Sequence, residues 1–421
     1  MSMRLLLGAC VLIWAISATA TPGMTAGTPL TLGQAIALVL DNNPQLRAAD
    51  FESRAAADRV QQQSQPMPWE LGVELENLAG SGQASGTSDL ETTLSLGRVL
   101  ELGDKSRLRG EVARFEAGML RHEQDVQRLD LVTEAARRFI DIAWVQAERK
   151  LSQEQLELTR RTLKAVEKRF RVGKAPAAEH SRAQINLAQA ELALEETDHL
   201  LANSWRQLSV LWGEFEPGYG SVQADLFRLE AEPHYAVLEQ LIERNPALVR
   251  LATAERLADA RLQLARASSR PDLDIRAGMR HFNDGNDLGL VLSLRMPLGS
   301  NGRARPYVTE ADSLMQRQPM LAQEQRFALR ATLFELHQEQ LHARDRLTVY
   351  QERIIPAAEK ALSDYSQGYA AGRYSLLELT SAQEVLLEAR REVLSAAIDH
   401  HKTGVEIVRL TGATLTTGAD Q

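Results

Sequence analysis

The sequence predicts a mainly helical protein of two structural repeats, in which long coiled-coil helices are combined with four β-strands. Three observations support this fold class. The 421 residues include only 26 glycines, 14 prolines and 5% aromatic residues, a composition that favours long helices over a large aromatic core. Several short motifs occur twice, in the same order. Two pairs of segments alternate apolar and polar residues over roughly ten positions each, which is the side-chain period of a β-strand.

The composition also excludes several classes of function. The chain has 48 basic and 56 acidic residues and a formal charge of −8, which argues against nucleic acid as a partner, because phosphates attract clustered lysine and arginine. Cys10 is the only cysteine, so an internal disulfide, a CxxC redox pair and a cysteine-based zinc site are excluded. With 25% charged and 44% hydrophobic residues, the chain is neither disordered nor a helical membrane protein.

Residues 1–20 are predicted to form a secretory signal peptide. They contain one basic residue, an apolar stretch (Leu5–Ile16) and a small-residue cleavage site ending at Ala20, so the mature chain would begin near Thr21. A lipoprotein cleavage box around Cys10 is the alternative, but the apolar stretch continues past this cysteine, which favours ordinary cleavage. No later window is long and apolar enough for a membrane helix, so any membrane crossing would be made by strands.

The chain is predicted to consist of two repeats, residues 21–225 and 226–421. The step from Phe170 to Gly173 has a counterpart 199 positions later, from Tyr369 to Gly372. The dipeptide Asn43-Pro44 recurs 202 positions later as Asn245-Pro246. Generic similarity between leucine-rich helices would not also align the glycines and the Asn-Pro steps. Five more matches have the offset of 199: Glu179 with Glu378, Ala183-Gln184 with Ala382-Gln383, Ala190 with Ala389, Leu211 with Leu410, and Gly213 with Gly412.

Each repeat is predicted to begin with a helix and to continue with a β-hairpin. The first helix is predicted over residues 31–63, with Thr31 as its N-cap and Pro66 beyond its end. The hairpins are predicted at residues 69–100 and 272–297, where apolar side chains occupy every second position. Each strand has about 9–11 residues, the length that a tilted strand needs to cross a bilayer. Periodicity alone fits equally well two hairpins on a small sheet in water.

Long helices are predicted to follow each hairpin, over residues 105–213 and 303–412. Residues 105–172 contain no proline, and a helix of this length spans roughly 100 Å, too much for a compact domain. Apolar and alanine residues at spacings of three and four predict coiled-coil seams along the following helices. The long helix of the second repeat is predicted to be interrupted at three prolines: Pro306, Pro319 and Pro356.

Four strands do not close a barrel, because the two edge strands keep unpaired backbone groups that are costly in lipid. A small membrane barrel needs about eight strands or more. If these strands enter a membrane, the chain therefore has to share one barrel with copies of itself, continued by a tube of helices. This argument predicts cyclic association but does not select the number of subunits.

These motifs resemble the TolC-type outer-membrane efflux proteins over nearly all of the mature chain, from about Leu32 to Gly412. The Asn-Pro steps and the aromatic-x-x-Gly step into an Ala-Gln helix that ends in Leu-x-Gly are typical of that family. A sharper local match is Glu76-Asn77, followed by a glycine-rich stretch and by the run from Leu100 to Arg107. This pattern is similar to the heavy-metal cation (CzcC-like) branch, although Ser106 stands where that branch usually has arginine.

The resemblance implies a homotrimer in the outer membrane, with the helical part in the periplasm. Each chain would give four strands to one twelve-stranded barrel and pack its helices into a tunnel. The tunnel would meet an inner-membrane RND pump through a periplasmic adaptor protein and export solutes, in this branch heavy-metal cations. Family members with an N-terminal lipid have a cysteine at the mature start, where this chain has Thr21.

The resemblance also implies a working end at the tip of the tunnel. The two helix-hairpin turns would form the tip and dock the adaptor; they contain Arg171, Val172 and Gly173, and Ala371, Gly372 and Arg373. Glu378 and Glu179 would form the gate, together with Ser381, which stands where some members have another acid. The alternative for the turn residues is that they form ordinary helix-hairpin turns, in which glycine is favoured because it adopts a positive φ. The alternative for the acidic residues is that the helix dipole favours a negative charge in the first turn of a helix.

The sequence offers no sign of catalysis or of a cofactor. Nucleophile-elbow, P-loop and dinucleotide-binding motifs are absent, so no enzymatic activity is predicted. No two histidines are four positions apart, so metal chelation by the chain is not expected; His337 and His342, for example, do not share a helix face. A periplasmic coiled-coil scaffold or adaptor that is soluble in water is the alternative function that the sequence leaves open.

Overall fold

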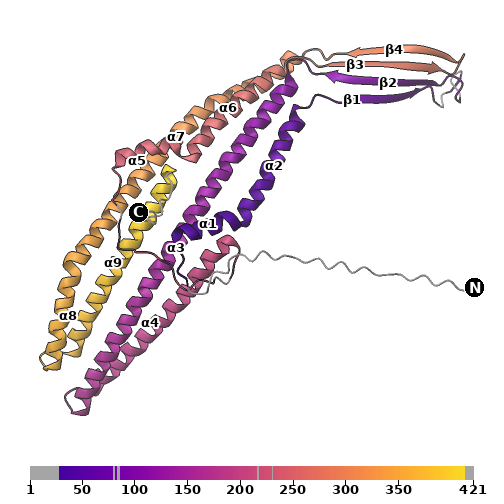
Figure 1. The fold of residues 1–421 in the computed structure, drawn as a ribbon. Coiled ribbons are helices and arrows are strands. Elements are labelled where there is room, and N and C mark those ends of the chain that lie inside the picture. Colours follow the sequence, from indigo (N-terminus) through magenta and orange to yellow (C-terminus); the bar gives the residue numbers. More distant parts are fainter. Residues whose placement is uncertain (1–27, 79–80, 83–85, 216–217, 230, 413–421) are drawn as a thin grey trace, which may run out of the picture.

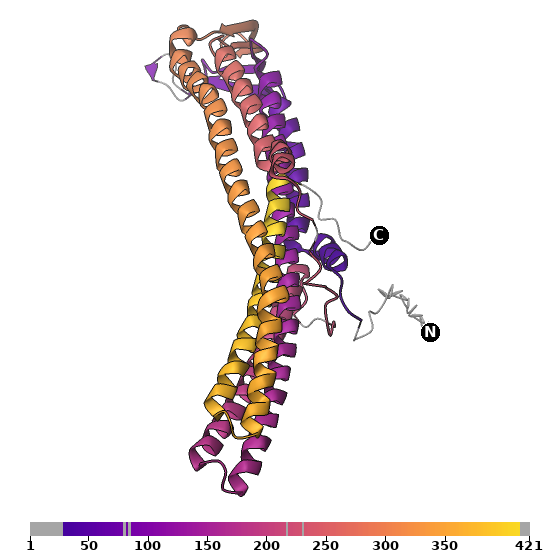
Figure 2. The same cartoon turned by 90° about the vertical axis from the view of Figure 1, so that its left-hand side faces the viewer.

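In the computed structural model the chain forms an elongated helical rod with a β-sheet at one end (Figures 1 and 2). The predicted signal peptide lies outside the described residues, so its prediction is not tested. The structure describes residues 28–78, 81–82, 86–215, 218–229 and 231–412.

The first half of the chain contains four α-helices and the first two strands. They are, in order, α1 (Leu32–Asn42), α2 (Pro44–Ser64), β1 (Trp69–Glu76), β2 (Glu91–Leu100), α3 (Lys105–Arg171) and α4 (Ala177–Ser209), which continues into the 3₁₀ turn η2 (Val210–Trp212).

The second half contains the remaining elements. They are α5 (Tyr235–Leu241), the 3₁₀ turn η3 (Ile242–Arg244), α6 (Pro246–Ala267), β3 (Leu273–Phe282), β4 (Asp287–Arg295), α7 (Ser300–Val349), the π-helical turn η4 (Tyr350–Ile354), α8 (Ile355–Ala370) and α9 (Leu376–Thr411).

The helix predicted over residues 31–63 is divided into α1 and α2, so that prediction was wrong in its middle. Asn43 is extended, with φ −62° and ψ 123°, because the ring of Pro44 disfavours a helical conformation in the preceding residue. Pro44 then opens α2, and Thr31 forms the predicted capping box with Gln34 at the start of α1.

Only one of the three predicted proline interruptions occurs. α7 runs without a break through Pro306 and Pro319, so the prediction was wrong at these two positions. Pro319 is exposed, and water can therefore solvate the carbonyl that loses its backbone partner. Near Pro356 the helix does change: the five-residue π turn η4 precedes α8. A π turn fits here because proline has no backbone N–H, and the regular α-helical hydrogen-bond pattern is therefore interrupted at Pro356.

α3 has 67 residues and a length of roughly 100 Å, as predicted. Its buried residues form a narrow stripe with many alanines, which lets neighbouring helices approach closely. At mid-length, Ala135 and Ala136 of α3 and Ala396 and Ala397 of α9 are fully buried in one core with Leu208. No helix in the described part of the chain has the length and apolar character that a membrane span requires.

The four strands form one antiparallel sheet in the order β1-β2-β3-β4, so both predicted hairpins are confirmed. The central pair β2–β3 joins the two hairpins and aligns Leu94 with Met279. β1 and β4 are the edges, and within the described residues no strand pairs with their outer sides.

The two faces of this sheet differ in chemistry. One face is mainly apolar, with Arg98, Thr92 and His281 as its polar members. Leu71, Leu290 and Leu292 on this face are 72%, 89% and 79% exposed. The opposite face carries glycines and charged side chains. There Arg276 of β3 reaches over Gly97 of β2 to form an ion pair with Glu70 of β1, at 2.7 Å.

Candidate gate and docking site at the helical tip

The helical hairpins α3–α4 and α8–α9 end side by side at the end of the rod opposite the sheet (Figure 1). Their turns have the same geometry. Gly173 and Gly372 have φ of +70° and +79°, a conformation that glycine adopts without strain. In each turn the glycine N–H bonds the carbonyl three residues back, and the next N–H bonds the carbonyl five residues back, which is a Schellman motif.

The six residues predicted to dock an adaptor all lie on the surface of these turns. Arg171, Val172 and Gly173 are exposed on one turn, and Ala371, Gly372 and Arg373 are exposed on the other. Val172 is 66% exposed, which is high for an apolar side chain at the end of a long helix. The prediction of their position at the tip agrees with the fold, while their role as a docking surface stays a prediction.

Arg169 links the two turns. Its guanidinium donates to the backbone carbonyl of Tyr369 and lies 4.5 Å from the centroid of that ring, as a cation–π contact. It also donates to the carbonyl of Lys174 at 3.4 Å, within its own turn. One side chain of α3 therefore holds both hairpins at the tip.

Tyr369 is the buried centre of this contact. It is 2% exposed, and its hydroxyl donates to Oε2 of Glu179 at 3.3 Å. Burial, reinforced by the negative charge of Glu179, raises the pKa of Tyr369 to about 12. The phenol therefore keeps its proton at physiological pH and acts as the donor to α4.

Glu378 has different partners from Glu179, although the two occupy matched positions in the sequence. Its carboxylate accepts hydrogen bonds from the backbone N–H and the hydroxyl of Ser375, at 2.8 and 2.9 Å, and completes a capping box at the start of α9. These bonds lower the pKa of Glu378. Glu378 and Ser381 are both exposed and lie on the same helix, α9. Within the described residues, no hydrogen bond or ion pair joins either of them to Glu179.

Arg169 and Tyr369 were missed by sequence reasoning as site residues. Tyr369 gave a signal, because an aromatic residue stands three positions before the glycine in both halves. Arg169 gave none, since it lies among other basic residues at the end of α3, Lys168 and Arg171.

The profile of the family described as "Outer membrane efflux protein" matches residues 35–214 and 237–413. The chain belongs to this family. It is 24% identical to the cobalt-zinc-cadmium resistance protein CzcC of Cupriavidus metallidurans over 391 residues, which cover 92% of this chain and 91% of that protein. It is 28% identical to the nickel-cobalt-cadmium resistance protein NccC of Alcaligenes xylosoxydans over 222 residues, covering 52% of this chain and 49% of the other.

Solved structures have the same fold. CusC superposes with a TM-score of 0.77 at 17% identity and covers 93% of this chain and 94% of its own. VceC of Vibrio cholerae superposes with a TM-score of 0.74 at 17% identity, over 90% of this chain and 96% of its own. As a member of the outer membrane efflux protein family, the chain is an efflux channel protein of the outer membrane.

In this outer membrane efflux protein two histidines contact the segment before α5, which connects the two halves of the chain. His400 and Arg344 bind the two carboxylate oxygens of Glu232, each at 2.9 Å, and His337 binds the carbonyl of Pro233 at 3.3 Å. Burial raises the pKa of Glu232, but the hydrogen bond from His400, a backbone hydrogen bond and the positive charge of Arg344 together outweigh burial, and the pKa is lowered. Among the described residues, no group of three or more His, Cys, Asp or Glu side chains is arranged to hold a metal ion.

Proposed function

We propose that this protein is the outer-membrane duct of a tripartite RND-type efflux system and that its cargo is heavy-metal cations. The names of the relatives CzcC and NccC, both metal-resistance proteins, support the choice of cargo. A periplasmic adaptor and an inner-membrane RND pump complete the system. The duct performs no bond chemistry and needs no cofactor, because its work is to provide a polar passage that opens and closes.

The exposed apolar face of the sheet is the observation that carries this proposal. A row of leucines that is 67–89% exposed along β4 is unfavourable in water and suits lipid. Insertion of these leucines into lipid requires closure of the sheet, because no strand among the described residues pairs with the outer edges of β1 and β4. A homotrimer places β4 of one subunit beside β1 of the next and gives a twelve-stranded barrel with the charged face inward.

A two-repeat origin of the chain is part of the proposal, with residues 21–225 and 226–421 as the units. Matching contacts support it. The amide of Asn43 donates to the carbonyl of Leu211 at 2.8 Å, and the amide of Asn245 donates to the carbonyl of Leu410 at 2.7 Å. Each asparagine also caps the helix that its proline opens. The Asn-Pro and Leu-x-Gly motifs therefore meet in both halves.

The motif that resembles the metal branch has a structural role at the junction of sheet and rod. Lys105 donates to Asp272 at 2.6 Å and to the carbonyl of Arg270 at 2.8 Å, which fixes the start of α3 to the loop before β3. Arg109 forms a two-pronged ion pair with Glu101. These contacts orient the sheet on the helices, as a barrel continued by a tunnel requires.

At the other end, the tip docks the adaptor and closes the passage. In the closed duct Arg169 and Tyr369 hold α8 against α3 and α4. Glu378, Glu179 and Ser381 line the narrowed mouth in each of three subunits, where rings of carboxylates attract cations. Opening then requires the Tyr369–Glu179 contact to break.

The test uses cells that lack their own outer-membrane duct for metal export and that express this chain. We expect outer-membrane fractions to contain a species that cross-links as a trimer, and restored tolerance to cobalt, zinc or cadmium. A chain that is monomeric in outer-membrane fractions would contradict the shared barrel. A trimer that restores tolerance to organic toxins but not to metals would contradict the proposed cargo alone.

A further inference from the structure

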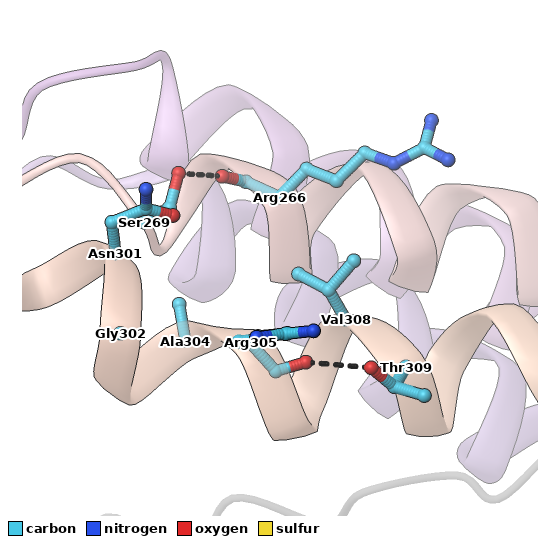
Figure 3. Close-up of a pocket in the computed structure, with 8 residues that line it drawn as sticks. All are labelled: Arg266, Ser269, Asn301, Gly302, Ala304, Arg305, Val308 and Thr309. Atoms are coloured by element: carbon cyan, nitrogen blue, oxygen red, sulfur yellow. Dashed lines mark hydrogen bonds between the residues drawn. The ribbon is translucent and has the colours of Figure 1, made fainter.

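A groove of about 430 Å³ lies between the last turn of α6 and the first turns of α7 (Figure 3). The groove lies at the end of the helices that is next to the sheet, since α6 leads into β3 and α7 follows β4. The residues that line it on the two helices include Arg266, Ser269, Asn301, Arg305, Val308 and Thr309.

The groove carries positive charge without compensation. Arg266 and Arg305 are exposed, and within the described residues neither guanidinium has an ion-pair or hydrogen-bond partner. None of the described residues that line the groove carries a carboxylate. By contrast, Arg261, one and a half turns earlier on α6, pairs with Glu116 at 2.8 Å. Guanidinium groups bind anions with several oxygens, such as phosphates, so two arginines without partners that line one groove favour an anionic ligand.

The remaining polar groups of the groove differ in what they offer an anion. The hydroxyls of Ser269 and Thr309 donate to backbone carbonyls, at 2.6 and 3.0 Å, so neither hydroxyl supplies a donor to an anion. The amide of Asn301 is a further donor on the first turn of α7. That turn contains no acidic residue and has no side-chain cap, so its backbone donors also favour an anion. Val308 lies between the two arginines (Figure 3) and supplies an apolar surface.

We propose that Arg266 and Arg305 bind the phosphate of an anionic phospholipid headgroup, such as that of phosphatidylglycerol. The choice of a lipid rests on the proposed function, because an apolar sheet that spans the outer membrane brings this groove to the periplasmic membrane surface. Arginines at such a surface are attracted to anionic headgroups, while the first carbons of the lipid contact Val308. Both arginine side chains are exposed, and binding of one phosphate requires the extended side chain of Arg266 to turn toward Arg305 (Figure 3).

The test compares the full chain with the double variant Arg266→Gln/Arg305→Gln, in nanodiscs of phosphatidylethanolamine with a minor fraction of phosphatidylglycerol. Native mass spectrometry counts the phosphatidylglycerol molecules that stay bound. The matched control is Arg161→Gln/Arg182→Gln, which removes two exposed arginines on α3 and α4 that are far from the sheet. We expect retention to fall about 25-fold in the test variant, about fivefold for each arginine at an anionic surface, and to stay unchanged in the control.

Equal retention of phosphatidylglycerol by the wild type and the double variant would overturn the proposal. So would a variant that loses affinity for inorganic phosphate but keeps phosphatidylglycerol, because the ligand would then be a free anion. A chain that does not enter nanodiscs would instead contradict the proposed membrane duct. Incorporation without arginine-dependent lipid retention would contradict the lipid site alone.

Discussion

The hydroxyl of Tyr369 donates a hydrogen bond to Glu179 across 3.3 Å and so joins the α8–α9 hairpin to the α3–α4 hairpin at the tip. Arg169 reaches the same tyrosine from α3, through its backbone carbonyl and its ring. Tyr369 of α8 is therefore in contact with both α3 and α4. If the tip is the gate, the free energy of this cluster contributes to the free energy of opening.

Replacement of Tyr369 by phenylalanine tests that role with little change in shape. The variant keeps the ring and its contact with Arg169 but loses the bond to Glu179. A hydrogen bond to a charged group contributes about 1.5–3 kcal/mol, so we expect the open probability of the reconstituted trimer to rise about tenfold or more. Single-channel recording measures it. Tyr365→Phe is the control, because the described residues give the hydroxyl of Tyr365 no hydrogen-bond partner. Identical open probabilities in the two variants would rule out the latch.

The raised pKa of Tyr369 predicts a response to alkaline pH. The closed tip favours the protonated phenol, so its stabilising contribution is complete below the ordinary tyrosine pKa, near pH 10. It is lost as the pH rises through about 12, the pKa of the buried group. We expect the wild-type channel to open progressively over this interval, whereas Tyr369→Phe should show no such response. The same alkaline opening in both proteins would assign the effect to other groups.

Glu378 provides a test of the proposed cation gate. Its pKa is lowered by the bonds from Ser375, so its charge is present above the ordinary glutamate pKa, near pH 4.3, and is lost only as the pH falls through a lower value. Divalent cations should therefore block the wild-type channel down to acidic pH. In Glu378→Gln we expect the block to weaken at every pH at which the wild-type carboxylate is charged, and to match the wild type at lower pH.

Ser375→Ala separates the charge of Glu378 from its capping role. This variant removes the hydroxyl that bonds the carboxylate at 2.9 Å but keeps the carboxylate itself. We expect the block to persist at neutral pH and to disappear at a higher pH than in the wild type, because the carboxylate loses a donor. If Ser375→Ala abolished the block at neutral pH as Glu378→Gln does, the helix start rather than the charge would be responsible.

Much of the fold follows from patterns in the sequence. Both hairpins and the long α3 were predictable. The alternation of apolar and polar residues in the strands and the absence of proline in α3 are visible in short stretches of sequence. Pairing of β2 with β3, which joins residues such as Leu94 and Met279, depends on the packing of distant helices and leaves no local signal. The continuous helix through Pro319 was not predictable either, because it depends on solvent exposure of the position.

The candidate site was predictable in position but not in contacts. The repeat placed Glu179 and Glu378 in equivalent positions, yet one accepts from a tyrosine of the other hairpin and the other from the serine that caps its own helix. A capping box is visible in sequence as serine followed by glutamate three positions later. The partner of Glu179 is 190 positions away, and only tertiary packing brings it close.

Lys105 offers a test of the junction between sheet and rod. It is 9% exposed and donates to Asp272 and to the carbonyl of Arg270, so Lys105→Met removes two contacts and leaves Asp272 without its cation. Breaking such a pair costs about 3 kcal/mol when it is fully buried, and less here because Asp272 is 37% exposed. We expect the trimer to dissociate at a lower temperature in detergent, as measured by heat-dependent gel mobility. Arg107→Gln, which removes a side chain 60% exposed, should leave that temperature unchanged. Equal dissociation temperatures for Lys105→Met and the wild type would show that the junction does not support assembly.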